Sequence, residues 1–305
     1  MPFSDIYRKQ VALLVRVLPL VAEETCFALK GGTAINLFIR DMPRLSVDID
    51  LTYLPIQPRP ESLAAIDAAL KRIAARGRQK IERAHVTESV LEPERILTKI
   101  FVQADGVQIK IEVTPVLRGC VYEPTRRTVS AAVEEAFGFA EIQVVSFADL
   151  YGGKIVAALD RQHPRDFFDG HDLLANEGID EALRRAFAVY LISHGRPMFE
   201  VLAPPRKDLA PEFTRGFDKM SDAVVTLEEL IAAREALIKS IVGGMPESHR
   251  RFLVSFERGR PDWKLLGVAG VADLPAVKWR QQNLDKLSSE RRVKLVSQLE
   301  KVLFL

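Results

Sequence analysis

Two aspartates, Asp48 and Asp50, alternate with apolar residues in one short stretch of the chain. In a β-strand successive side chains point to opposite faces, so the two carboxylates would share one face. Val47, Ile49 and Leu51 would take the other face, where they can be buried. Neighbouring carboxylates repel each other unless a positive charge lies between them, and Mg²⁺ (or Mn²⁺) prefers oxygen ligands of this kind. A polar strand face or a turn would have the same pattern, so the surrounding residues must decide.

A pair of glycines, Gly31 and Gly32, lies upstream, between an apolar segment at 26–29 and a run with helix-like apolar spacing at 33–40. This order predicts a strand, a tight turn and the start of a helix. Backbone N–H groups at a helix N-terminus bind phosphate oxygens, and glycine lets a phosphate approach closely. An ordinary strand-to-helix turn with Thr33 as N-cap would look the same. The candidate nucleotide-binding residues are Lys30, Gly31, Gly32 and Thr33.

A third carboxylate, Glu112, lies in a segment with strand-like alternation over Val107–Val113. If that strand lies beside the aspartate strand, Glu112 could complete a set of three metal ligands. Metal ions held in this way can orient an attacking hydroxyl and stabilise charge on a transferred phosphate. The alternative is a solvent-facing glutamate paired with Lys110 or with a neighbouring strand.

A second motif follows in the other half of the chain. Lys154 and Arg161 are seven residues apart on a predicted helix over 147–160, which places them on the same side. Asp166 and Asp169 fall three apart on the next helix, which begins near Pro164. The two basic residues could neutralise a triphosphate while one aspartate orients the acceptor. A surface lysine together with an Arg165–Asp169 salt bridge is the purely structural alternative.

These segments resemble a known family. The runs GGTAINLFIRD, RLSVDIDL and FADLYGGKIVAALDRQHPRDFFDGHDLL, with LPAVKWRQQNL near the end, are similar to the AbiEii/AbiGii group of nucleotidyltransferase toxins. This group, which includes MenT-like toxins, lies within the polymerase-β-like nucleotidyltransferase superfamily. The serine of the superfamily's glycine-serine pair is replaced here by Gly32, with Thr33 one place later.

The resemblance implies a mixed α/β (α+β) core with a C-terminal helical domain, and transfer of nucleotide from an NTP with release of pyrophosphate. It also implies that Lys154 and either Asp166 or Asp169 are essential. Ser46, expected on the same strand face as Asp48, would adjoin the nucleotide, and some toxins of this kind are silenced by phosphorylation there. The alternative is that Ser46 is only a small polar strand residue. The implied partners are a tRNA 3′ end as acceptor and a cognate antitoxin, in a toxin–antitoxin or phage-defence pair.

The composition limits the remaining possibilities. The chain has 305 residues, 48% of them apolar, and two cysteines without metal-type spacing, so we expect a reduced cytoplasmic protein. No apolar run is long enough for a membrane span. The net charge is only +2, but six basic residues crowd the stretch 71–83. Such a stretch favours RNA contact, although it is equally typical of a solvated helix face.

The predicted organisation is a nucleotidyltransferase core at 1–145 and a mainly helical domain at 146–305, with the site in the cleft between them. Helices are expected at 5–26 and 61–76, and strands across 84–116 with a turn at Gly106. Two other functional classes stay open. One is an enzyme that nucleotidylates a protein or a small molecule such as an antibiotic. The other is a non-catalytic module that binds NTP or a partner protein.

Overall fold

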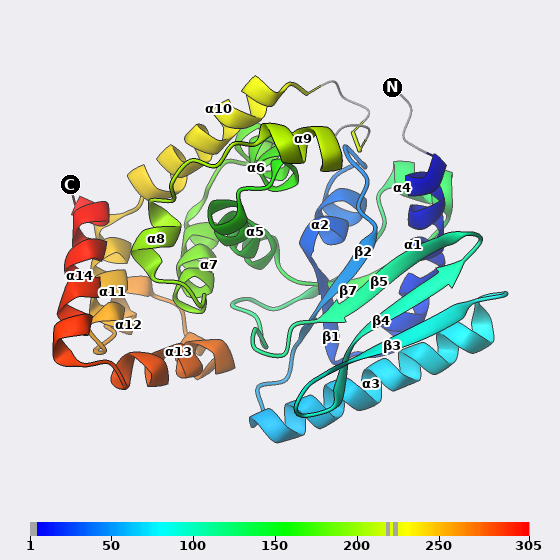
Figure 1. The fold of residues 1–305 in the computed structure, drawn as a ribbon, viewed down its shortest axis with the longest axis horizontal. Helices are drawn as coiled ribbons and strands as arrows, with labels where there is room; N and C mark the ends of the chain where they lie inside the picture. Colours follow the sequence, from blue (N-terminus) through cyan, green and yellow to red (C-terminus); the bar gives the residue numbers. More distant parts are fainter. Residues whose placement is uncertain (1–4, 218–219, 222–224, 305) are drawn as a thin grey trace. The chain divides into compact units, whose positions relative to one another are not determined.

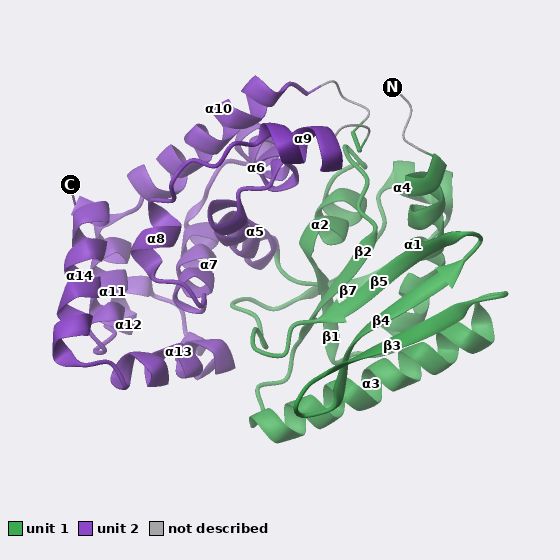
Figure 2. Cartoon of the chain, viewed as in Figure 1, with its two compact units in different colours: residues 1–146, 218–224 green, residues 147–217, 225–305 purple. Residues whose placement is uncertain are grey.

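The computed structural model describes residues 5–217, 220–221 and 225–304 (Figure 1). The chain forms two compact units (Figure 2). Unit 1 comprises Met1–Ser146 with Asp218–Val224, and unit 2 comprises Phe147–Phe217 with Val225–Leu305.

The division differs in one respect from the predicted domains, because a segment of the second half returns to unit 1. The backbone N–H of Leu45 donates a hydrogen bond to the Met220 carbonyl at 2.8 Å. The Ser221 hydroxyl donates to the Pro43 carbonyl at 3.1 Å. These bonds fix the returning segment against the loop that precedes the aspartates.

Unit 1 is built on a seven-stranded mixed sheet in the order β3-β4-β5-β2-β1-β7-β6. The strands are β1 Phe27–Lys30, β2 Asp48–Tyr53, β3 His85–Leu91, β4 Ile96–Ala104, β5 Val107–Val113, β6 Thr125–Thr128 and β7 Glu141–Val144. β2 runs parallel to β5 and antiparallel to β1, while β1 runs parallel to β7. The mixed α/β fold predicted from the sequence is confirmed.

One face of this sheet is apolar and packs against helices. Ile49 of β2 pairs with Ile111 of β5, which pairs with Ile100 of β4, and all three side chains are fully buried. Helix α1 (Asp5–Ala22) packs against β5 and β7, and α3 (Arg59–Lys80) packs against β3 and β4. The strand period of two therefore leaves the polar side chains of β2 and β5 on the opposite face.

The helices of unit 1 differ in detail from the prediction. The first ends at Ala22 rather than residue 26, and α3 is longer at both ends than expected. The short helix after the glycines begins at Gly31 as α2 (Gly31–Ala34) and continues as a π-helix, η1 (Ile35–Ile39). A further helix, α4, spans Ala131–Phe137.

Within the described residues of unit 2, 147–217 and 225–304, all the regular secondary structure is helical. Its helices are α5 Phe147–Arg161, α6 Pro164–Asn176, α7 Glu181–Ile192, α8 Met198–Leu202, α9 Ala210–Gly216, α10 Leu227–Ile238, η2 Lys239–Gly243, α11 Glu247–Glu257, α12 Trp263–Leu266, η3 Val271–Asp273, α13 Pro275–Asp285 and α14 Ser289–Phe304. Helix α5 packs closely on α7 at Gly152. A Cβ at this position would lie only 2.8 Å from the Phe187 nitrogen.

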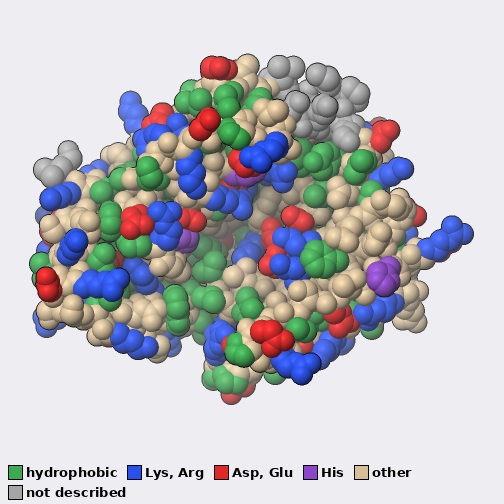
Figure 3. Space-filling view, in the orientation of Figure 1, with side chains coloured by type: hydrophobic (Ala, Val, Ile, Leu, Met, Phe, Trp, Pro, Cys, Tyr) green, Lys and Arg blue, Asp and Glu red, His purple; other side chains and the backbone are tan. Residues whose placement is uncertain are grey.

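Charged side chains of both signs are mixed over the visible surface of each unit (Figure 3). Within the described part of the chain, none of the helices combines the length and the apolar character needed to cross a membrane.

Candidate active site

The predicted carboxylates lie together on the polar face of the unit 1 sheet. Asp48 and Asp50 both belong to β2, and Asp50 lies directly opposite Glu112 of the parallel neighbour β5. The strand adjacency that the third-ligand prediction required is therefore present. Carboxylates directly opposite each other repel unless a positive group compensates them.

Three lysines from neighbouring strands supply that compensation. Lys110 Nζ lies 2.8 Å from Glu112 Oε2 and 3.9 Å from Asp48 Oδ2. Lys99 Nζ lies 3.2 Å from Glu112 Oε1. Lys30 lies opposite Asp50 in the antiparallel β1–β2 register. We call these six residues the charged row: Lys30, Asp48, Asp50, Lys99, Lys110 and Glu112.

The charged row changes the acidity of its members. Burial raises the pKa of Asp50, against the opposing charges of Lys110 and Lys30. Burial also acts to raise the pKa of Glu112, but hydrogen bonds from Lys110 and Lys99 outweigh it and lower that pKa. Burial lowers the pKa of the Lys30 ammonium, although Asp50 opposes the shift.

The oxygen donors of Asp48 and Asp50 suit a hard divalent cation, and a buried carboxylate with a raised pKa gains from such a neighbour. Among the residues that the structure describes, however, no group of three His, Cys, Asp or Glu is arranged to hold a metal ion. Glu112 faces its lysines instead. The metal-ligand roles of Asp48, Asp50 and Glu112 stay predictions.

The turn at Gly31 and Gly32 places the backbone close to the polar face of the sheet. Gly31 has a left-handed φ of 77°, and a Cβ there would lie 2.7 Å from Asp50 Oδ2. A Cβ at Gly32 would lie 2.9 Å from both Arg44 Nη2 and Ser46 Oγ. Only glycine permits both the backbone conformation at position 31 and the close approach of the chain to Asp50.

Thr33 is not an N-cap, which was the alternative to its predicted nucleotide-binding role. The cap position is Lys30, whose side chain makes no capping hydrogen bond, and Thr33 lies inside α2. The Thr33 hydroxyl contacts Ser46 Oγ at 3.1 Å and donates to the Asp48 carbonyl. Ser46 precedes β2 in the loop and is not part of the strand, contrary to the prediction. Thr33 thus ties the glycine turn to the start of the aspartate strand.

Arg44 belongs to this site but was not predicted from the sequence. Its side chain is buried, and Nη1 donates to the Leu45 carbonyl at 3.0 Å. The guanidinium also lies against Gly32. Its position two residues before Ser46, in the run that carries both aspartates, is the one signal in the sequence that could have singled it out.

Unit 2 contains the second predicted set of residues as a compact buried cluster. Lys154 Nζ lies 3.1 Å from Asp166 Oδ1 and 2.8 Å from Asp169 Oδ2. Arg161 binds both oxygens of Asp166, at 2.5 Å and 2.7 Å. The side chains of Asp166 and Asp169 are 0% and 1% exposed, whereas that of Arg161 is 61% exposed. We call these four residues the buried ion cluster: Lys154, Arg161, Asp166 and Asp169.

One part of the purely structural alternative, a lysine on the helix surface, is wrong. Lys154 is buried and not on the surface. Arg165 donates through Nε and Nη2 to the Gly216 carbonyl, at 3.0 Å and 2.8 Å. Burial alone would raise the pKa of Asp166, but Lys154 and Arg161 hold that pKa well below its usual range. Asp166 is therefore an ionised carboxylate paired with both cations, and Asp169 lies against the Lys154 ammonium.

The link between α5 and α6 sets the position of Arg161. Gln162 has a left-handed φ of 51°, and its amide donates to the Pro205 carbonyl at 2.8 Å. His163 caps α6 by accepting a hydrogen bond from the Arg165 backbone N–H at 3.1 Å. Pro164 occupies the first turn of α6, as predicted.

The basic stretch at 71–83 is largely neutralised within unit 1. Arg72 and Arg76 both bind Glu24, at 2.6 Å and 2.8 Å. Lys80 lies 3.0 Å from Glu23, and Arg78 lies 2.6 Å from Glu88. The stretch therefore fits the solvated helix face better than an open surface for RNA.

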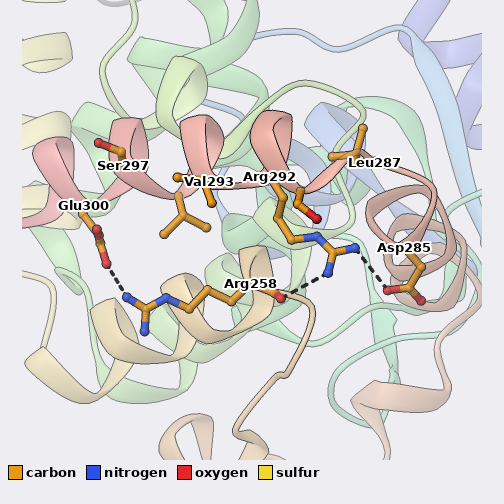
Figure 4. Close-up of a pocket in the computed structure, with 9 residues that line it drawn as sticks. Arg258, Asp285, Leu287, Arg292, Val293, Ser297 and Glu300 are labelled. Atoms are coloured by element: carbon orange, nitrogen blue, oxygen red, sulfur yellow. Dashed lines mark hydrogen bonds and ion pairs between the residues drawn. The ribbon is translucent and has the colours of Figure 1, made fainter.

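A separate cavity of about 690 Å³ lies among α11, α13 and α14 in unit 2 (Figure 4). Its wall contains an ion pair between Arg258 and Glu300 at 2.6 Å, with Arg292 3.7 Å from Asp285. Val293 contributes an exposed apolar side chain. None of the predicted site residues lines this cavity.

Comparison with known proteins adds an independent result. A family model described as the nucleotidyl transferase AbiEii toxin of a type IV toxin–antitoxin system matches residues 12–283. The fold is similar to that of MenT4, a nucleotidyltransferase toxin from Mycobacterium tuberculosis, with a TM-score of 0.55 and 14% sequence identity. The alignment covers 96% of this chain and 92% of MenT4. No curated protein matches the sequence.

Proposed function

The chain belongs to the AbiEii family of nucleotidyltransferase toxins, and from this we propose that it transfers nucleotide from an NTP to the 3′ end of tRNA, with Mg²⁺ as the metal and release of pyrophosphate. Nucleotidyltransferases of this kind use an NTP and a divalent metal ion. The observation that carries the proposal is the approach of the Gly31 backbone to Asp50, on the strand face that also carries Asp48.

We assign the following roles in unit 1. Asp48 and Asp50 hold the metal, which when bound would neutralise and orient the phosphates of the nucleotide. The backbone of Gly31 and Gly32 contacts phosphate oxygens at the start of α2, where N–H groups are unsatisfied. Thr33 and Ser46 fix the separation between the turn and Asp48 through their hydroxyl contacts.

In unit 2, Arg161 is the member of the buried ion cluster that a phosphate can reach, because most of its side chain is exposed. Lys154 acts through the carboxylates that it pairs, and so sets the position of Asp166 and Arg161. Asp169 is held by the same ammonium. One of the two buried aspartates orients the acceptor through the cations that it holds, and transfer assays of Asp166→Asn and Asp169→Asn identify which.

The proposed reaction is a displacement at the α-phosphorus. The acceptor hydroxyl oxygen forms a bond to that phosphorus, the bond to the oxygen that bridges to the β-phosphate breaks, and pyrophosphate leaves with the electron pair. The hydroxyl proton passes to solvent. The protein contributes mainly by positioning the reactants and balancing charge, as in other phosphoryl transfers.

The tRNA acceptor and the cognate antitoxin are proposed from the family, as is a role in phage defence. A type IV toxin implies an antitoxin partner. Ser46 is the proposed place for its control, since a phosphate on that hydroxyl would add negative charge beside Thr33 and the Asp48 strand.

The test is incubation of the purified full chain with Mg²⁺, each labelled NTP in turn and total tRNA. Asp48→Ala is the catalytic variant, and Asp105→Asn is the matched control, because Asp105 is a surface aspartate of unit 1 paired with Arg16. We expect label in tRNA with the wild type and Asp105→Asn, and none with Asp48→Ala.

Other outcomes point elsewhere. Label in the protein itself, or in an added lysate protein, would support the protein-modifying alternative. NTP binding without any transfer would support the non-catalytic module. Transfer retained by Asp48→Ala would refute the metal assignment.

A further inference from the structure

The charged row is electrically balanced without any metal. It contains three lysines and three carboxylates, from four adjacent strands in the order β4-β5-β2-β1. Lys30, Asp50, Glu112 and Lys99 lie opposite one another across those strands. Asp48 and Lys110 form the next opposite pair. A divalent cation that enters this face therefore meets carboxylates that already lie opposite lysines.

Lys110 is the lysine of the charged row that lies close to two of the predicted metal ligands. Its ammonium lies 2.8 Å from Glu112 and 3.9 Å from Asp48, so it reaches two of the three predicted metal ligands from one position. Lys110 is also only 28% exposed, and Glu112 is 33% exposed, so water screens their interaction only in part. Lys99 holds the other oxygen of Glu112.

We propose that Lys110 is a resident counter-cation that competes with the divalent metal for the Asp48–Glu112 side of the charged row. In the nucleotide-free protein Glu112 is engaged by Lys110 and Lys99, and Asp48 and Asp50 remain as the metal's own ligands. Lys110 thus keeps metal affinity low until the phosphates of an NTP bring further negative charge. This inference rests on the proposed function, because it concerns the metal of that same site.

The test is a titration of nucleotide-free full-length protein with Mn²⁺, in which the electron paramagnetic resonance signal of the unbound ion reports binding. Lys110→Met removes the ammonium, and Lys110→Gln provides a second variant if the first does not fold. Lys71→Met is the matched control, because Lys71 is paired with Asp67 on α3, away from the charged row. Melting curves check that each variant is folded.

We expect both Lys110 variants to bind Mn²⁺ at least about tenfold more tightly than wild type, since a unit charge within about 4 Å of a ligand repels a divalent ion strongly. Lys71→Met should bind like wild type. If folded Lys110 variants bind Mn²⁺ no more tightly than wild type, or more weakly, the inference is overturned.

A further variant separates this inference from the proposed function. Asp48→Asn should weaken Mn²⁺ binding whatever Lys110 does. If Asp48→Asn binds Mn²⁺ like wild type, the metal does not lie at this face and the proposed function loses its metal site. If Asp48→Asn loses binding while the Lys110 variants gain none, the Lys110 inference alone fails.

Discussion

Replacement of Lys154 by methionine should destabilise unit 2 strongly. Methionine can fill the buried space, but it removes an ammonium that lies within 3.1 Å of Asp166 and 2.8 Å of Asp169. Arg161 still binds both oxygens of Asp166, so most of the loss concerns Asp169. Removing one partner of a buried ion pair costs about 3–5 kcal/mol, and we expect the lower end, about 3 kcal/mol, because Arg161 remains.

The measurement is differential scanning calorimetry of wild type and Lys154→Met at pH 7. For a unit of this size, 3 kcal/mol corresponds to a fall in melting temperature of roughly 6–12 °C. The double variant Lys154→Met/Asp169→Asn removes the Asp169 carboxylate together with the Lys154 ammonium, and should recover much of the lost melting temperature. Arg83→Met is the surface control, since the Arg83 side chain is 87% exposed and pairs with Glu82 at 3.6 Å.

The pH dependence provides a second check. The folded state lowers the pKa of Asp166 below its ordinary value of 3.8. Its contribution is therefore complete above that value and is lost as the pH falls below it. Lys154 is one of the two cations that lower this pKa, so the part of the stability difference between wild type and Lys154→Met that comes from Asp166 should shrink below about pH 4. A difference that stays constant from pH 7 to pH 3, or a variant as stable as wild type, would refute the ion-pair reasoning.

Three further results are expected. Gly31→Ala should abolish transfer, because its Cβ would lie 2.7 Å from Asp50 Oδ2. Gly106→Ala, at φ 78° with no atom within 4 Å of the added Cβ, should lower the free energy of unfolding by about 1 kcal/mol and keep transfer activity. Nucleotide labelling and melting curves test both variants. Burial lowers the pKa of His249, so the stability of the folded chain falls as the pH drops below 6.5, where the unfolded histidine takes up its proton first. In calorimetry from pH 7 to 5, the melting temperature of His249→Gln should therefore fall less steeply than that of wild type. Lys80→Ala should leave the salt dependence of tRNA labelling unchanged, because Lys80 is paired with Glu23, and a shallower dependence would contradict that assignment.

The sequence predicts well those features that depend on local periodicity. The alternation over Val107–Val113 predicts a strand with Glu112 on its polar face, and the structure contains that strand. The same rule places Asp48 and Asp50 on one face of β2. The family resemblance is confirmed by the family model, and with it the assignment as a nucleotidyltransferase.

Features that depend on residues far apart in the sequence cannot be predicted from local patterns. The basic residues Arg72 and Arg76 look like a free patch until the fold brings Glu24 from the end of α1 beside them. Lys154 looks like a surface residue until α6 covers it with Asp166 and Asp169. In each case the sequence specifies the charge, and long-range packing decides what neutralises it.

The role of Thr33 is a third case. A threonine after Gly-Gly fits an N-cap by propensity. The helix instead begins at Gly31, which adopts a left-handed φ, and Thr33 lies in its first turn. Its hydroxyl then reaches Ser46 and the Asp48 carbonyl, which no local pattern specifies.

The return of the chain at Met220 and Ser221 determines how this protein can be dissected. A fragment ending at Ser146 would lack the two residues that bind Pro43 and Leu45, a few positions before Asp48. Unit 1 is thus encoded in two separate pieces, with residues 147–217 inserted between them. An isolated unit 1 would have to join residue 146 to residue 218 through a linker, or take up the second piece as a peptide.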